Sequence, residues 1–151
     1  MENLSVLLVD DEEDFLRTIV KRLLKRGIAA QGVSRGEEAL ALLAEKPRDV
    51  VMLDVKMPGM GGLEVLKHIK AQWPTTEVIM LTGHGEVSSA VEGMRLGAYD
   101  YLMKPYEYEY LVVKIQEAYR VKRERDQRLK KAEERSLLDK LESSWSPGRR
   151  I

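Results

Sequence analysis

Residues 50–54 read Val-Val-Met-Leu-Asp, and residues 55–59 continue as Val-Lys-Met-Pro-Gly. A short apolar run with β-branched residues, bounded by turn formers, is typical of a strand buried on both faces of a parallel sheet. The run ends in a carboxylate, Asp54, which does not serve packing. Since reaction sites in open α/β sheets lie outside the carboxyl ends of the strands, Asp54 is a candidate site residue. Taken alone, Asp54 fits equally well as a cap on the turn before Pro58.

Strand and helix patterns alternate on both sides of this strand. Further strands are predicted at residues 5–9, 28–33, 78–81 and 99–103. The helices expected between them run from the acidic residues 10–14 to Gly27, and then over residues 36–45, 63–72 and 88–95, with a last helix starting at residue 107.

Local signals predict the faces and ends of the first two helices. Ile19, Leu23 and Leu24 are spaced to bury one face of the first helix together with Phe15. Ser34 is expected to be the N-cap of the second helix.

Five strands that alternate with helices, joined by short loops, predict an α/β fold with a doubly wound parallel sheet covered on both faces. Right-handed crossovers leave two common strand orders. No Gly-x-Gly-x-x-Gly motif follows the first strand, so the flavodoxin-like order 2-1-3-4-5 is favoured.

The composition fits a globular protein, with 151 residues that are 44% hydrophobic and 33% charged. The absence of cysteine excludes disulfides and thiolate metal sites. No apolar run approaches the roughly 20 residues that span a bilayer. The start of the chain lacks the features of a signal peptide, so we expect a cytoplasmic protein with no membrane partner.

The formal net charge of zero conceals an asymmetry. Residues 1–119 carry 14 Lys+Arg against 19 Asp+Glu, net −5, whereas residues 120–151 carry 11 against 6, net +5. An acidic body and a basic tail suggest two functional parts. We therefore divide the chain into a domain at 1–120 and a charged helical extension at 121–151.

In the expected strand order, the ends of the first and third strands are neighbours, so Asp10, Asp11 and Asp54 converge. Thr82 and Lys104 follow the two neighbouring strands. Carboxylates packed this closely raise one another's pKa unless cations offset them, and Mg²⁺ suits such oxygen ligands. Asp54 is then expected to attack a phosphoryl donor as a carboxylate nucleophile, with the other groups stabilising charge.

The chain resembles the receiver domains of two-component response regulators, and most closely those attached to enhancer-binding AAA+ transcription regulators. The resemblance covers residues 4 to about 120. It is carried by Leu7-Leu8-Val9-Asp10-Asp11-Glu12, by Leu53-Asp54-Val55-Lys56-Met57-Pro58-Gly59-Met60, by Met80-Leu81-Thr82-Gly83, and by residues 97–105, Gly-Ala-Tyr-Asp-Tyr-Leu-Met-Lys-Pro.

The resemblance implies that Asp54 is the phosphoacceptor and that Lys104 bridges the phosphoryl oxygens, with a cis bond between Lys104 and Pro105. It implies a Mg²⁺ site made by Asp10, Asp11, Asp54 and the backbone carbonyl of Lys56.

The resemblance also implies a switch, formed by Thr82 and Tyr101. The output surface would then comprise the helix at 88–95, the strand at 99–103 and the start of the last helix. A sensor histidine kinase is the expected partner, and a homodimer through this surface or through the last helix is a further partner hypothesis. His84, in the loop beside the site, is expected to tune the site or face solvent.

Two other classes of function have requirements that this sequence does not meet. An aspartyl-phosphate phosphatase of the haloacid-dehalogenase kind requires a second Asp two residues after the nucleophile, where this chain has Lys56. A nucleotide-binding domain requires a Gly-x-x-x-x-Gly-Lys-Ser/Thr loop, which the sequence lacks. A signalling phosphoacceptor, which assists its own phosphorylation and dephosphorylation but is no turnover enzyme, is therefore the leading hypothesis.

The last helix is expected to continue past the domain, because residues 121–141 contain no Gly or Pro. It should stop before Ser143-Ser144, and at the latest by Pro147-Gly148. Its apolar 4-3 spacing is interrupted by Lys122 and Arg125, a broken heptad. Two interpretations stay open, a solvated charged helix and a helix for dimerisation or output coupling. No base-reading motif appears, so direct nucleic-acid binding is not expected.

Overall fold

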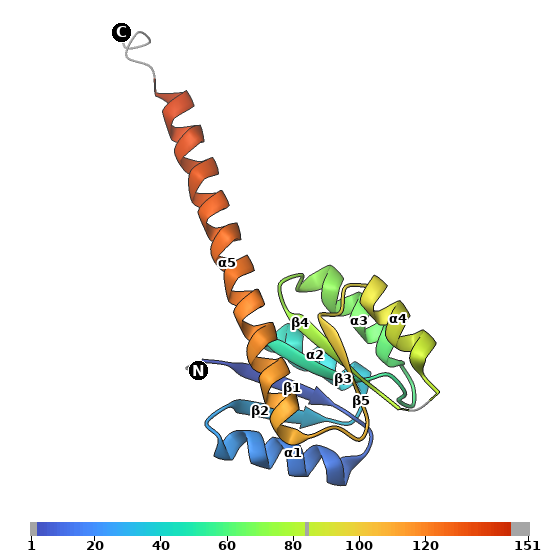
Figure 1. The fold of residues 1–151 in the computed structure, drawn as a ribbon. Helices are drawn as coiled ribbons and strands as arrows, with labels where there is room; N and C mark the ends of the chain where they lie inside the picture. Colours follow the sequence, from blue (N-terminus) through green and yellow to red (C-terminus); the bar gives the residue numbers. More distant parts are fainter. Residues whose placement is uncertain (1–2, 84, 146–151) are drawn as a thin grey trace.

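The computed structural model describes residues 3–83 and 85–145, which form a five-stranded parallel sheet with helices on both faces (Figure 1). The strand order is β2-β1-β3-β4-β5, as predicted. Within the described ranges, no helix combines the length and the apolar character needed to cross a membrane. The elements in chain order are β1 (Ser5–Val9), α1 (Glu13–Lys25), β2 (Ala29–Val33), α2 (Gly36–Glu45), β3 (Val50–Asp54), α3 (Gly62–Gln72), β4 (Glu77–Thr82), α4 (Val87–Arg95), β5 (Asp100–Met103) and α5 (Tyr108–Ser144).

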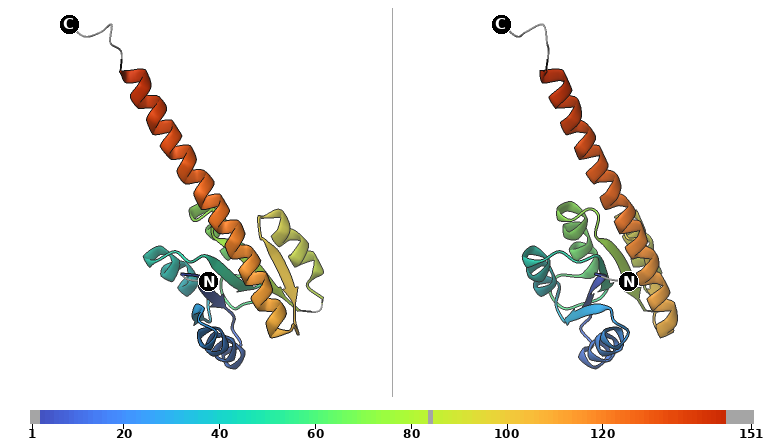
Figure 2. Two further views of the ribbon diagram at one scale, coloured as in Figure 1. Left: turned by 60° about the vertical axis from the view of Figure 1, so that its left-hand side comes forward. Right: turned by 90° about the vertical axis from the view of Figure 1, so that its left-hand side faces the viewer.

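The central strand β3 is buried along its whole length, and its side chains alternate between two cores. Val50 and Met52 pack on the face of the sheet covered by α1 and α5. Val51 and Leu53 pack on the opposite face, with residues of α2 and α3. Figure 2 shows these two helical layers from the side. The continuous apolar pattern of this strand thus follows from burial on both faces.

Helix α1 buries a face that differs in one residue from the prediction. Ile19 and Leu23 are buried as expected, whereas Leu24 is 53% exposed. Adjacent helical residues point about 100° apart, so the inward direction of Leu23 turns Leu24 toward solvent. Leu16 completes the buried stripe instead. Gly27 ends the helix region with φ +87°, a conformation that favours glycine.

The expected cap of α2 was wrong. The N-cap residue is Arg35, and no side chain caps the helix. A cap at Ser34 requires a helix that begins one residue earlier than Gly36.

Helix α5 is 37 residues long, and its N-terminal part packs on the sheet before the helix leaves the body as a straight rod (Figures 1 and 2). It ends at Ser144, so the expected stop before Ser143 fell two residues short. Pro147-Gly148 lies outside the described residues. The buried residues of α5 are Leu111, Val112, Ile115, Ala118 and Tyr119.

Candidate functional site

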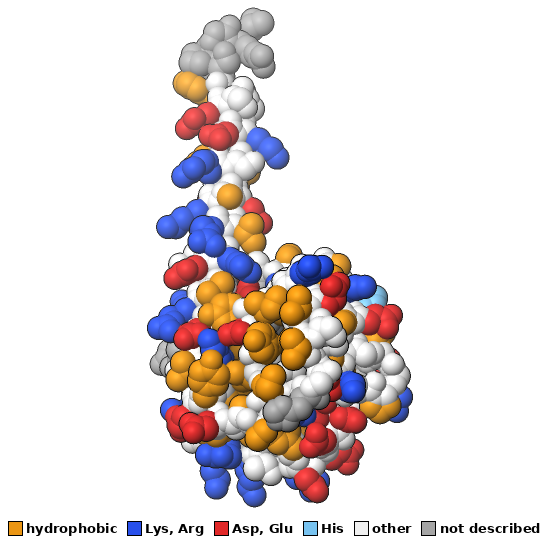
Figure 3. All heavy atoms as spheres, turned by 45° about the vertical axis from the view of Figure 1, so that its right-hand side comes forward, with side chains coloured by type: hydrophobic (Ala, Val, Ile, Leu, Met, Phe, Trp, Pro, Cys, Tyr) orange, Lys and Arg blue, Asp and Glu red, His pale blue; other side chains and the backbone are white. Residues whose placement is uncertain are grey.

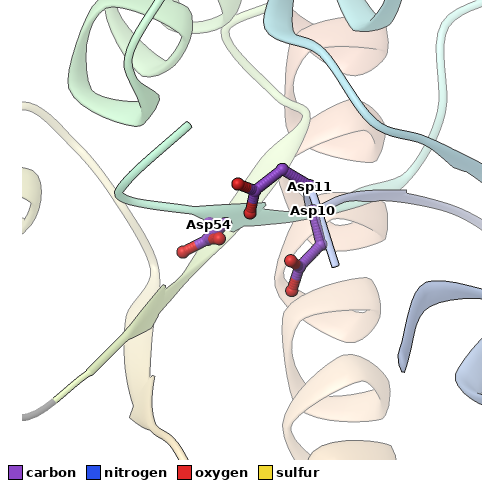
Figure 4. Close-up of side chains that lie close together, drawn as sticks. All are labelled: Asp10, Asp11 and Asp54. Carbon is purple, nitrogen blue, oxygen red and sulfur yellow. The ribbon is translucent and has the colours of Figure 1, made fainter. Parts of the chain in front are cut away.

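Three aspartates meet where β1 and β3 end side by side (Figure 4). Asp10 follows β1, and Asp54 is the last residue of β3. Their carboxylate oxygens and one of Asp11 all lie within 4.8 Å of one another. Asp10 and Asp54 are only 1% and 7% exposed, while Asp11 faces solvent. The convergence expected from the sequence is therefore present.

The backbone around Asp54 is held in place from both sides. Val55 N–H donates to the Leu81 carbonyl oxygen at 3.0 Å, and Gly62 N–H donates to the Val55 carbonyl oxygen at 3.0 Å. A Cβ at Gly62 would lie 2.3 Å from the Asp54 carbonyl oxygen, so only glycine allows α3 to begin this close to the strand end. This packing fixes the direction in which the Asp54 side chain leaves the strand.

Lys104, just after β5, brings the positive charge to the site. Its Nζ lies 2.9 Å from Asp10 Oδ2, 3.3 Å from Glu12 Oε1 and 3.7 Å from Asp54 Oδ2. Its backbone N–H donates to the Thr82 carbonyl oxygen at 2.7 Å, which ties the loop to β4. The Lys104–Pro105 bond is cis, as the resemblance implied.

The ammonium of Lys104 contacts Asp10, Asp54 and Glu12, and Asp11 lies in the same cluster, so negative charge is in excess around it. Burial and the neighbouring charge of Asp10 raise the pKa of Asp54, and Lys104 offsets only part of this rise, so the pKa reaches about 7. Although burial lowers the pKa of Lys104, the hydrogen bond and charge of Asp10 raise it above its ordinary value. A clustered set of oxygen donors with unmatched negative charge is the environment that Mg²⁺ favours. The residues present therefore fit a divalent cation.

Thr82 and Tyr101 both line a groove of about 410 Å³ between α4 and β5. The Thr82 side chain is buried, and its hydroxyl donates to the Leu102 carbonyl oxygen at 3.4 Å rather than toward Asp54. Tyr101 is 44% exposed at the mouth of the groove. The two residues thus line one groove, Thr82 buried and Tyr101 partly exposed.

Two acidic contacts at the site were not anticipated. Glu12, one of the acidic residues at the predicted start of the first helix, pairs with Lys104. Glu86 accepts a hydrogen bond from Gly83 N–H at 3.0 Å, and its other oxygen lies 3.6 Å from Lys56 Nζ. Position next to Asp11 was a signal for the first contact, whereas nothing local indicated the second. His84 lies outside the described residues.

The chain matches the family described as the response regulator receiver domain over residues 6–116. It is 40% identical over 121 residues to an NtrX-like response regulator of Rickettsia bellii, covering 78% of this chain and 25% of that protein. It is 36% identical over 143 residues to the regulatory protein AtoC of Escherichia coli, covering 95% of this chain and 30% of that protein. The chain thus spans about a quarter to a third of the length of the curated relatives it matches.

Two solved receiver structures agree with this fold along nearly their whole length. A response regulator receiver domain protein from Clostridium thermocellum superposes with a TM-score of 0.76 and 35% identity, covering 80% of this chain and 97% of that chain. The receiver domain of NtrX from Brucella abortus superposes with a TM-score of 0.73 and 32% identity, covering 76% and 98%.

Proposed function

Since this chain belongs to the response regulator receiver domain family, we propose that it accepts a phosphoryl group on Asp54 from a sensor histidine kinase and signals through the conformational change that follows. The observation that carries the proposal is the meeting of Asp10, Asp11, Asp54 and Lys104 at the ends of the strands. In this role the chain is a phosphoacceptor that assists its own phosphorylation and dephosphorylation.

In the proposed reaction an Asp54 carboxylate oxygen attacks the phosphorus of the donor. The bond from phosphorus to the donor breaks, its electron pair leaves with the donor, and an acyl phosphate forms on Asp54. Lys104 stands where its ammonium can neutralise the phosphoryl oxygens. Mg²⁺, held by Asp10, Asp11, Asp54 and the Lys56 carbonyl, would supply further positive charge to those oxygens.

The proposed switch begins at Thr82. The Thr82 hydroxyl now donates to the Leu102 carbonyl oxygen. A phosphoryl group on Asp54 would offer this hydroxyl a stronger acceptor, because the phosphoryl oxygens are charged. Movement of Thr82 toward Asp54 opens space in the groove for the ring of Tyr101. One local contact thereby biases a two-state element.

The output surface would be α4, β5 and the first turns of α5. Figure 3 shows hydrophobic side chains gathered on the body beside the projecting helix. A second copy of this chain, bound here or along α5, is the proposed partner besides the kinase. The exposed large hydrophobic residues of this surface are Val87, Val91, Met94, Tyr101, Met103, Tyr110 and Val113.

We further propose residues 1–120 as the receiver unit and 121–151 as the extension that couples it to an output. Relatives of this chain include a DNA-binding transcriptional regulator, NtrC of Salmonella typhimurium. Control of transcription is therefore the proposed output, with the receiver itself making no contact with DNA.

Incubation with acetyl phosphate and Mg²⁺, followed by intact-mass spectrometry, tests the proposal. The wild-type chain should gain one phosphoryl group that is stable in acid and lost in base, and chelation of Mg²⁺ should abolish the gain. Asp54→Ala should gain none. Asp14→Ala is the matched control, since Asp14 is an exposed acid of the same acidic run. Undiminished labelling of Asp54→Ala would contradict the assignment.

A further inference from the structure

Two acids stand at the edge of the sheet opposite the site, where the strands begin. Glu77 is the first residue of β4 and is 1% exposed. Asp49 precedes β3, and its carboxylate accepts a hydrogen bond from Ser5 N–H at 2.9 Å. Both acids face α5. Lys122 Nζ lies 3.4 Å from Asp49 Oδ1, and the Arg125 guanidinium donates to the Glu77 carboxylate.

The two cations of α5 continue the stripe that packs on the sheet. Ile115, Ala118, Lys122 and Arg125 follow one another at intervals of three and four residues, so they lie on one face of the helix. Apolar packing of this face ends at Tyr119. The helix would leave the body there if the next positions carried no contact. The interruption of the heptad is therefore the point at which the helix meets the acidic edge of the sheet.

We infer that Asp49, Glu77, Lys122 and Arg125 form an ionic joint that fixes the direction in which residues 127–144 leave the domain. Exposed single ion pairs constrain geometry little. Here the Glu77 carboxylate is buried and the Asp49 and Lys122 side chains are mostly shielded from water, whereas Arg125 is partly exposed. A buried carboxylate must keep its partner, so the helix turn that bears Arg125 stays on the sheet.

If the ionic joint fixes the base of residues 127–144, a small tilt of α5 produces a large displacement at the end of the helix. The 18 residues beyond Asp126 extend about 27 Å at about 1.5 Å per residue, so a tilt of about 10° would move the tip by about 5 Å. A change in the tilt of α5 relative to the body would then be transmitted in full to the end of the helix at Ser144. Only the statement that α5 shifts relative to the body rests on the proposed function.

Distances between two spin labels test the joint directly. The sequence has no cysteine, so nitroxides can be placed at Lys67→Cys on α3 and Ser136→Cys on the rod, both exposed positions. Pulsed electron resonance should give a single narrow distance distribution. Lys122→Gln with Arg125→Gln should widen it at least twofold. Lys130→Gln with Lys131→Gln makes the same charge change on the exposed rod and should leave the width unchanged.

A neutral version of the joint guards against loss of the fold. Substitution of all four residues (Asp49→Asn, Glu77→Gln, Lys122→Gln and Arg125→Gln) leaves neither Asp49 nor Glu77 as an uncompensated charge. Asp126, the other partner of Lys122, is partly exposed, and Lys70 keeps its hydrogen bonds to the Pro74 and Thr76 carbonyl oxygens. The domain should therefore stay folded while the distribution widens. A width equal to that of the parent, in either the double or the fourfold variant, would overturn the inference.

Beryllofluoride with Mg²⁺ separates the joint from the proposed function. A displaced but still narrow distribution supports both the joint and the signalling role. A narrow distribution that beryllofluoride leaves in place would count against the signalling role and still support the joint.

Discussion

The two edges of the sheet both bury carboxylates, but they balance the charge differently. At the carboxyl edge, the ammonium of Lys104 pairs with Asp10, Glu12 and Asp54, and Asp11 belongs to the same cluster of carboxylates. At the amino edge, Asp49 pairs with Lys122, which also pairs with Asp126, and Glu77 pairs with Arg125 and lies near Lys70.

Glu77 shows what matched charge does at the amino edge. Burial raises its pKa above the ordinary value of a Glu, and the charges of Lys70 and Arg125 offset part of this rise. The acids at the amino edge are therefore already paired with cations of the chain, whereas the carboxyl edge has unmatched negative charge available for a cation and a phosphoryl group. The position of this unmatched charge distinguishes a site from a structural ion pair.

The largest effect on the free energy of unfolding is expected for Asp54→Asn, measured with a chelator present. The ordinary pKa of an Asp is 3.8 and that of Asp54 in the fold is about 7, so the folded chain holds a proton that the unfolded chain releases. Stability is therefore lost as pH rises between these values, by at most about 4 kcal/mol at about 1.36 kcal/mol per pKa unit.

Asp54→Asn removes that cost. We expect its free energy of unfolding in urea to exceed that of wild type by about 2–3 kcal/mol at pH 8, with a smaller gain at pH 5. A gain that is equal at both pH values, or a loss at pH 8, would show that the charge at this edge is already matched.

The opposite sign is expected at the amino edge. Arg125→Gln leaves the buried Glu77 carboxylate without its guanidinium, and stability at pH 8 should fall by about 2 kcal/mol, since Arg125 itself is partly exposed. Glu77→Gln combined with Arg125→Gln should recover most of the loss in the same urea titration. Failure of the second substitution to recover it would mean that the two residues are not coupled.

A smaller effect on stability is expected from Mg²⁺, which should bind at the carboxyl edge of the sheet and not at the amino edge. Mg²⁺ at ten times its dissociation constant should stabilise the wild-type chain by about 1.4 kcal/mol, because it binds only the folded site. The rise in melting temperature should disappear in Asp11→Asn and persist in Asp49→Asn. Equal rises in both variants would place the cation elsewhere.

The sequence was a good guide where one local pattern had one structural solution. The apolar run 50–54 predicted a strand buried on both faces, and the strand order that followed brought Asp10 and Asp54 together. The order also placed Lys104 beside them.

Features that depend on rotation or on distant partners could not be predicted in this way. Leu24 fitted the apolar spacing of α1, but the rotation of the helix on the sheet decides which leucine is buried. Lys122 and Arg125 were recognised only as a break in a heptad. Their partners, Asp49 and Glu77, are more than 45 residues away and reach them only through the topology of the sheet.

The most direct test is to locate the phosphoryl group itself. Borohydride reduces an aspartyl phosphate to homoserine, which peptide sequencing by mass spectrometry identifies. After treatment with acetyl phosphate and Mg²⁺, homoserine should appear at position 54 and at no other aspartate, and the control without Mg²⁺ should show none. Homoserine at Asp10 or Asp11 in place of Asp54, or its absence from chain that has gained a phosphoryl group, would contradict the account.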